Sequence, residues 1–216
     1  MFSGASNYAE SVDNVMFFIT SISVVMLIGM TFFMILFVIK YNRKRHPVAS
    51  QIEGNTFLEI LWIVLPTILV MIMFYYGYAN FIKLRENTPS QFTVNVTAFQ
   101  WGWKFNYANG VTTDTLYIPL EKTTKLEMKS NDVIHSLYIP AMRIKEDVLA
   151  SQVNYIVLTP KFADSYDIAC AEYCGLRHAY MYTKLVVMPQ AEFDKWLSLK
   201  TAQLVKDAKL KENTEK

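Results

Sequence analysis

Both cysteines of the chain lie in one short segment, Cys170–Met181, which reads CAEYCGLRHAYM. Cys170 and Cys174 are followed by His178 and then by Met181. Thiolate, imidazole and thioether side chains are all metal ligands, and soft sulfur ligands select metals such as copper and zinc. The residue types and their spacing therefore indicate a metal site.

A disulfide, a zinc site and a copper site are three interpretations of this segment. Cysteines at i and i+4 bridge awkwardly, and the short loop that they would close stabilises a fold little. A disulfide also gives His178 and Met181 no role. Zinc binds thiolate and imidazole but does not need a thioether. Copper accounts for every residue, because a blue-copper site combines two histidines, one cysteine and a weak axial methionine.

The second histidine of such a site is available upstream. His135 lies in the strand-like stretch NDVIHSLYIPAM. The segment also carries one cysteine more than a single copper ion needs, and two thiolates can bridge two metal ions. A binuclear copper site would spread the charge of a transferred electron over both ions, so that little geometry has to change.

Two uncharged apolar runs precede these residues, VMFFITSISVVMLIGMTFFMILFVI from Val15 and ILWIVLPTILVMIMFYYGYANFI from Ile60. Each is long enough to cross a bilayer. We predict a transmembrane hairpin over residues 1–85, with helices at about 15–39 and 58–82. The first run lacks the basic flank and small-residue cleavage pattern of a signal peptide, so we expect it to be retained.

The loop between the two runs, KYNRKRH, carries four basic residues, whereas the segment before the first run has none. Cytoplasmic loops are enriched in Lys and Arg. We therefore expect the loop on the cytoplasmic or matrix side and both termini on the periplasmic or intermembrane side.

The second half of the chain has a different pattern. After a polar linker at 86–91, residues 92–189 contain short alternating stretches such as FTVNVTAFQWGWKFNY, which are typical of an antiparallel β-sandwich or barrel. Residues 190–216 alternate Lys with Glu and Asp and predict a solvated helix that frays into disorder. The formal net charge of +2 does not favour a nucleic-acid partner.

Taken together, these features resemble subunit II of haem–copper oxygen reductases, the cytochrome c oxidase type, over nearly the whole chain. The motif Cys-x-Glu-x-Cys-x-x-x-His-x-x-Met is specific to that family, and its Asp-x-x-His-Ser pattern occurs here at Asp132 to Ser136. The resemblance implies a membrane-anchored protein, with a two-helix hairpin followed by a cupredoxin-like Greek-key β-sandwich or barrel.

The resemblance also implies a binuclear copper A centre with specific ligands. Cys170 and Cys174 would supply bridging thiolates, and His135 and His178 would supply imidazoles. Met181 would be a weak ligand to one copper. The backbone carbonyl of Glu172 would be a weak ligand to the other, and its side chain would bind a magnesium ion shared with subunit I, in line with the preference of Mg²⁺ for carboxylate oxygen.

Two further residues acquire expected roles. FQWGWKFNY resembles the family's Gln-Trp-x-Trp segment, which makes Trp101 the residue that receives electrons, although aromatic strand residues such as Trp103 also pack cores. Glu59 occupies the place of a family glutamate near a proton path into subunit I. The pattern from Thr56 to Glu59 is also that of a helix capping box.

The implied function is that of a subunit of a proton-translocating oxidoreductase in a bacterial or mitochondrial inner membrane. The chain would accept electrons from cytochrome c and pass them to haem in subunit I, where oxygen is reduced to water. The alternatives are a copper A subunit of a nitric oxide reductase, a quinol oxidase subunit, which lacks copper ligands, and a membrane-tethered copper carrier or assembly protein.

The sequence does not predict a face for docking cytochrome c. Acidic residues near the ligands could attract a basic cytochrome. Basic residues, among them Lys145, Lys161 and Arg177, occur in the same part of the chain. The acidic residues in question are Asp132, Glu146, Asp147, Asp164 and Asp167.

Overall fold

The computed structural model describes residues 4–48, 53–86 and 88–214, with side chains described as far as residue 210. Asn87 of the predicted linker and residues 215–216 of the predicted tail lie outside this part. The chain forms two units, one of residues 11–83 and one that combines residues 1–10 with 84–216.

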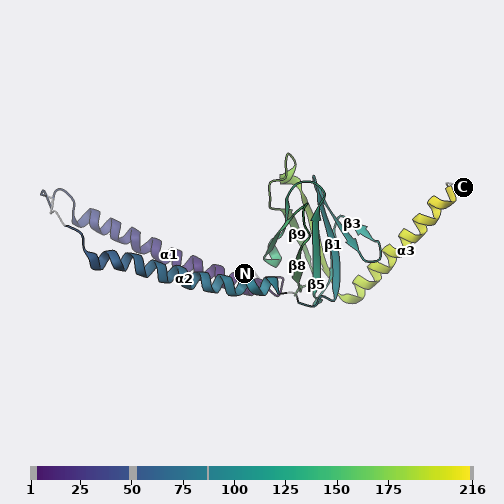
Figure 1. Cartoon of the computed structure of the whole chain (residues 1–216), viewed down its shortest axis with the longest axis horizontal. Helices are drawn as coiled ribbons and strands as arrows, with labels where there is room; N and C mark the ends of the chain where they lie inside the picture. Colours follow the sequence, from purple (N-terminus) through teal and green to yellow (C-terminus); the bar gives the residue numbers. More distant parts are fainter. Residues whose placement is uncertain (1–3, 49–52, 87, 215–216) are drawn as a thin grey trace. The chain divides into compact units, whose positions relative to one another are not determined.

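The first unit is a hairpin of two long helices, α1 (Ala9–Lys40) and α2 (Thr56–Arg85), which lie side by side (Figure 1). The most apolar 18-residue window has a mean hydropathy of 2.8 in α1 and 2.5 in α2, and none of its residues is buried. Helices of this length reach about 45 Å at 1.5 Å per residue, beyond the roughly 30 Å of a bilayer's hydrocarbon core. Both helices extend past the predicted ranges, because their polar ends continue the backbone hydrogen bonding.

The start of α2 differs from the predicted capping box. Asn55, the residue before the helix, accepts hydrogen bonds through its side-chain oxygen from the amides of Phe57 and Leu58, at 3.1 and 3.2 Å. Asn55 is therefore the N-cap, which satisfies amides that have no partner within the helix. Thr56 is the first helical residue, and Glu59 lies in the first turn with its side chain exposed.

The second unit is a sandwich of two five-stranded sheets, ordered β3-β2-β1-β5-β8 and β4-β10-β9-β6-β7. Inward-facing residues alternate with outward-facing ones along the strands, so that one face of each sheet forms the core. The strands are β1 (Phe92–Phe99), β2 (Gly102–Tyr107), β3 (Thr112–Thr113), β4 (Leu116–Pro119), β5 (Thr124–Ser130), β6 (His135–Ile139), β7 (Ile144–Val148), β8 (Asn154–Leu158), β9 (Ser165–Cys170) and β10 (Tyr182–Met188).

Two features of the sheets depart from the sequence-based expectation. The pairs β1–β5 and β4–β10 are parallel, so the sandwich is mixed rather than wholly antiparallel. Strand β7 was not predicted, because its sequence IKEDV is mostly charged. Only Ile144 and Val148 of this strand are buried in the core, and pairing with β6 holds it in the sheet.

The segment before α1 belongs to the β-domain. Ala5 donates its amide to the carbonyl of Ala141 and accepts from the amide of Lys161, both at 2.8 Å. The buried Ser6 hydroxyl donates to the carbonyl of Met142 at 2.7 Å. A chain that leaves the β-domain into α1 and returns to it after α2 has both ends of the hairpin on one side of a membrane.

Helix α3 (Gln190–Thr214) begins against the sandwich and then leaves it (Figure 1). Its first turns depart from the expected solvated helix. Phe193 is 2% exposed and meets Phe92 edge-on at 5.0 Å between ring centroids. Trp196 stacks on Tyr117 at 4.3 Å. The residues from Ala202 to Leu210 are exposed, as predicted for the tail.

Replacing Phe193 by Ala should lower the free energy of unfolding of the β-domain by about 3 kcal/mol, because it leaves a cavity under the first turns of α3. Denaturant titration of the full chain in detergent, followed by tryptophan fluorescence, measures the change. Leu199, on the same helix, is 62% exposed. Leu199→Ala is the matched control and should stay within about 0.5 kcal/mol of the parent chain. Equal losses in the two variants would contradict the packing of α3.

Candidate metal centre

The pairing of β6 with β9 brings the first two predicted ligands together. Leu137 lies opposite Cys170 in this antiparallel register. His135 is two residues from Leu137 and points to the same inner side, where it is fully buried. Neighbours related diagonally across a strand pair are within reach of long side chains. The Nδ1 atom of His135 consequently lies 3.8 Å from the sulfur of Cys170.

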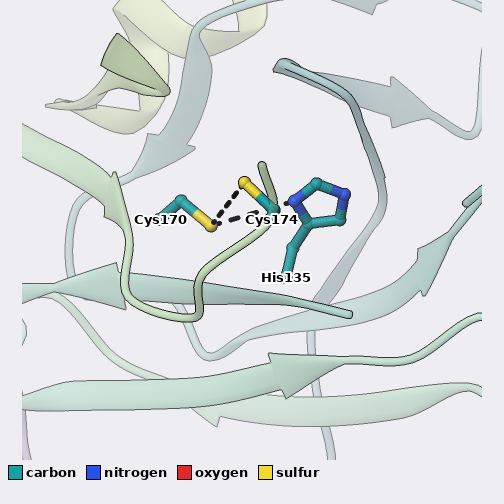
Figure 2. Close-up of side chains that lie close together, drawn as sticks. All are labelled: His135, Cys170 and Cys174. Atoms are coloured by element: carbon teal, nitrogen blue, oxygen red, sulfur yellow. Dashed lines mark hydrogen bonds between the residues drawn. The ribbon is translucent and has the colours of Figure 1, made fainter. Parts of the chain in front are cut away.

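The loop between β9 and β10 adds the other predicted ligands. The sulfurs of Cys170 and Cys174 are 3.8 Å apart (Figure 2). The sulfur of Cys174 lies 3.6 Å from Nδ1 of His178 and 3.8 Å from the sulfur of Met181. The backbone oxygen of Glu172 lies 3.3 Å from the sulfur of Cys170. All six predicted ligand residues thus contribute an atom to one cluster.

The spacing of the two sulfurs excludes the disulfide and is compatible with a metal site. A disulfide needs about 2.05 Å between sulfurs, so both cysteines are free in this structure. A metal ion about 2.3 Å from each sulfur would have an angle of about 110° between them, close to tetrahedral. The ligand atoms of His135, Cys170 and Cys174 all lie within 4.8 Å of one another. His135 lies beside one sulfur and His178 beside the other, so two ions would each find an imidazole.

Burial affects the protonation of the cysteines. Desolvation, together with the neighbouring Cys170, raises the pKa of the Cys174 thiol to about 11. Without a metal, Cys174 is therefore a neutral thiol at pH 7. A metal ion must displace this proton to bind the thiolate, which makes its affinity fall as the pH falls.

Asp132 fixes the orientation of His135. One oxygen of Asp132 lies 2.8 Å from Nε2 of His135, and the other accepts the amide of Gln100 at 2.7 Å. Burial acts to raise the pKa of Asp132, but hydrogen bonds from His135, Gln100 and Val133 outweigh it and hold the pKa below its usual value. A carboxylate on Nε2–H leaves Nδ1, which faces Cys170, free to bind a metal.

The turn between β1 and β2 is attached directly to the ligand loop. The Gln100 side-chain amide and the Trp101 indole N–H both donate to the backbone carbonyl of Cys174, at 2.7 and 3.2 Å. Gly175, at φ +119°, makes this approach possible, because a Cβ there would lie 3.2 Å from the Trp101 ring. The roles of Gln100 and Gly175 were not predicted from the sequence, although a glycine directly after a predicted ligand cysteine was an available signal.

The remaining candidates lie apart from the cluster or at its edge. Trp103 is 3% exposed, packs in the core and meets the His135 ring at 6.2 Å between centroids. The Glu172 side chain is exposed. Glu59 belongs to the hairpin unit and not to this cluster.

The sequence model of the transmembrane domain of cytochrome c oxidase subunit II matches residues 1–79. The model of the periplasmic domain of the same subunit matches residues 110–188. The two matches follow each other in the order of the two units and cover most of the chain. The chain belongs to the cytochrome c oxidase subunit II family.

Individual relatives agree with this assignment. Cytochrome c oxidase subunit 2 of Alkalihalophilus pseudofirmus is 31% identical over 86% of this chain, and that of Bacillus subtilis is 30% identical over 74%. The chain spans 58% and 50% of the length of these two relatives. The crystal structure of the periplasmic domain of subunit II from Bradyrhizobium japonicum covers 54% of this chain and 97% of its own, at 22% identity and a TM-score of 0.51.

Membership of the family confirms the predicted fold class, a two-helix anchor with a cupredoxin-like β-sandwich. It also implies a copper centre, for which the chain has a buried His/Cys/Cys group. The chain is a membrane protein, and the match to the periplasmic domain implies that the β-domain lies on the periplasmic side.

Replacing Asp132 by Ala should weaken copper binding about 10- to 100-fold, because His135 loses the partner that orients it. Competition between the full chain in detergent and a copper chelator measures the affinity. The Asp164 carboxylate accepts a hydrogen bond from the Ser165 amide at the end of β9 opposite to Cys170, so Asp164→Asn is the control and should bind as the parent does. Unchanged affinity in the Asp132 variant would contradict the orienting role.

Proposed function

We propose that this chain is the electron-accepting subunit II of a cytochrome c oxidase. It accepts electrons from cytochrome c on the periplasmic or intermembrane side of a respiratory membrane. It passes them to haem in subunit I, where oxygen is reduced to water and protons are pumped. The observation that carries this proposal is the cluster of sulfur and imidazole ligands around two sulfurs 3.8 Å apart.

The residues assigned to the copper pair have distinct parts. When bound, the copper pair supplies a one-electron store shared over two ions. Cys170 and Cys174 would hold both ions, and His135 and His178 would each hold one. Met181 and the backbone carbonyl of Glu172 would be the weak ligands. Burial of Cys174 and Met181, 3% and 1% exposed, excludes water and keeps the ligand geometry fixed.

Trp101 connects the surface to this cluster in the proposal. Its side chain is half-buried, and its indole N–H bonds to the carbonyl of Cys174 at 3.2 Å. An electron that reaches the ring is one hydrogen bond from the backbone of a bridging cysteine. Trp103 lies on the inner side of β2 and is assigned to the core instead.

Two assignments depend on the subunit I partner. The exposed Glu172 carboxylate is proposed as a ligand to a magnesium ion shared with subunit I, because hard cations prefer carboxylate oxygen. Glu59, exposed in the first turn of α2, is proposed to lie at the mouth of a proton path.

The burial of the proposed copper ligands argues against a copper carrier. A carrier exchanges its metal and needs accessible ligands, whereas His135 is 0% and Cys170 is 9% exposed. A quinol oxidase subunit lacks copper ligands, and this chain has them all. Co-purification with a subunit I that reduces oxygen, rather than nitric oxide, separates the oxidase from a nitric oxide reductase.

In the copper-loaded full chain, Trp101→Phe should slow reduction by reduced cytochrome c at least about tenfold, because the hydrogen bond to Cys174 is lost. Stopped-flow absorbance measures the rate, and copper content should not change. Trp196→Phe, at the first turns of α3, is the control and should react as the parent does. A parent chain that takes up copper but is not reduced by cytochrome c would contradict the proposed function.

A further inference from the structure

Gln100 makes two hydrogen bonds that reach different parts of the metal centre. Its backbone amide donates to one carboxylate oxygen of Asp132 at 2.7 Å, and the other oxygen of Asp132 lies 2.8 Å from Nε2 of His135. Its side-chain amide donates to the backbone carbonyl of Cys174, also at 2.7 Å. Gln100 therefore contacts both the segment that leads into β6 and the loop between β9 and β10.

Trp101, the next residue, is held to the ligand loop by one longer bond. An indole has a single N–H donor and no acceptor, so its bond to the carbonyl of Cys174 uses all the hydrogen-bonding capacity of this side chain. At 3.2 Å it lies at the long end of the range for N–H···O bonds, whereas the Gln100 bond lies at the short end. The ring is half-buried, so water can compete for its N–H. Trp101 by itself is therefore weakly held.

The two donors share one acceptor. A backbone carbonyl oxygen has two lone pairs and can accept both N–H groups at once. A Cβ atom at Gly175 would lie 3.2 Å from the side-chain nitrogen of Gln100 and 3.2 Å from Cζ2 of Trp101. Because glycine lacks this atom, both side chains can lie against the same stretch of backbone. The Gln100 bond thus holds the peptide group of Cys174 in the place where the indole N–H reaches it.

From these contacts we infer that Gln100 is a positioning residue for electron entry, which acts by keeping the Trp101 indole bonded to the ligand loop. The inference rests on the proposed function, in which electrons pass from Trp101 to the metal centre. Electron transfer slows steeply as the gap between donor and acceptor widens. Loss of the Gln100 side-chain bond would therefore slow electron entry, although every proposed metal ligand stays in place.

The first test needs no metal and uses the full chain in detergent. Exchange of the Trp101 indole proton with solvent is followed by ¹H–¹⁵N NMR, and the signal is identified by its loss in Trp101→Phe. In Gln100→Met the exchange rate should rise about tenfold, the factor that one net hydrogen bond contributes to an equilibrium. Methionine keeps the length of the side chain, and the backbone bond to Asp132 remains possible.

The second test measures electron entry into the copper-loaded full chain. Stopped-flow absorbance with an increasing excess of reduced cytochrome c gives a limiting rate and a half-saturating concentration. Gln100→Met should lower the limiting rate about tenfold, because a bond that orients the indole is lost. The half-saturating concentration should stay within about twofold, since it reports docking rather than positioning. Copper content and the copper spectrum should match those of the parent chain.

Gln190→Met is the matched control for both tests. Gln190 is exposed at the start of α3, and its side-chain amide donates to Asp194 at 2.8 Å. Strand β10 begins directly after the ligand loop and ends just before Gln190, which places this residue at the end of the strand far from the site. The control should match the parent in indole exchange, limiting rate and half-saturating concentration.

A double variant shows whether Gln100 acts through Trp101. Substitutions in residues that act as one unit are not additive. Trp101→Phe already lacks the indole N–H, so adding Gln100→Met to it should slow reduction by less than about twofold further. A further tenfold loss in the double variant would mean that Gln100 affects the reaction by another route.

Four outcomes would overturn the inference. They are an unchanged indole exchange rate in Gln100→Met, an unchanged or faster limiting rate, loss of copper from this variant, and full additivity in the double variant. The proposed function stands in each of them, because the parent chain still accepts electrons. A parent chain that takes up copper but is not reduced by cytochrome c would overturn the proposed function and the role in electron entry. The exchange measurement would then still decide whether Gln100 holds the Trp101 indole.

Discussion

The register between β6 and β9 is the constraint on which the site depends. It sets Leu137 opposite Cys170 and thereby brings the imidazole of His135 next to a cysteine that is far from it in sequence. Side chains alternate between the two faces of a strand, so a slip of one residue would turn His135 or Cys170 to the outer face. The buried neighbours Leu137, Ile139 and Ile168 make such a slip unfavourable.

Hydrogen bonds then transmit this constraint to the rest of the site. The amide of Cys170 donates to the carbonyl of Met181, which closes the ligand loop where β10 begins. Asp132 joins His135 to the β1–β2 turn through the Gln100 amide. Gln100 and Trp101 in turn bond to Cys174. The proposed ligands are therefore held by several elements before any metal binds, which suits the proposed electron transfer, during which the site should change little.

Most elements of the fold and the candidate metal ligands could be predicted from the sequence. The helices follow from the length of their uncharged runs, and the ligands from residue types at short spacing. Parts that depend on tertiary contacts could not be predicted. Strand β7 is mostly charged and exists because it pairs with β6. Helix α3 looks solvated by composition, yet Phe193 finds a place in the core. The contact of Trp101 with Cys174 depends on tertiary packing across a positive φ at Gly175, and the glycine alone does not indicate which side chain approaches it.

The electron paramagnetic resonance spectrum of the copper-loaded full chain, together with a count of copper per chain, tests whether the two sulfurs hold a shared copper pair. We expect about two copper ions and one unpaired electron whose hyperfine pattern comes from two copper nuclei. Cys170→Ser should abolish that pattern. One copper ion per chain, with a hyperfine pattern from a single nucleus, would contradict the claim that the two sulfurs hold a shared pair.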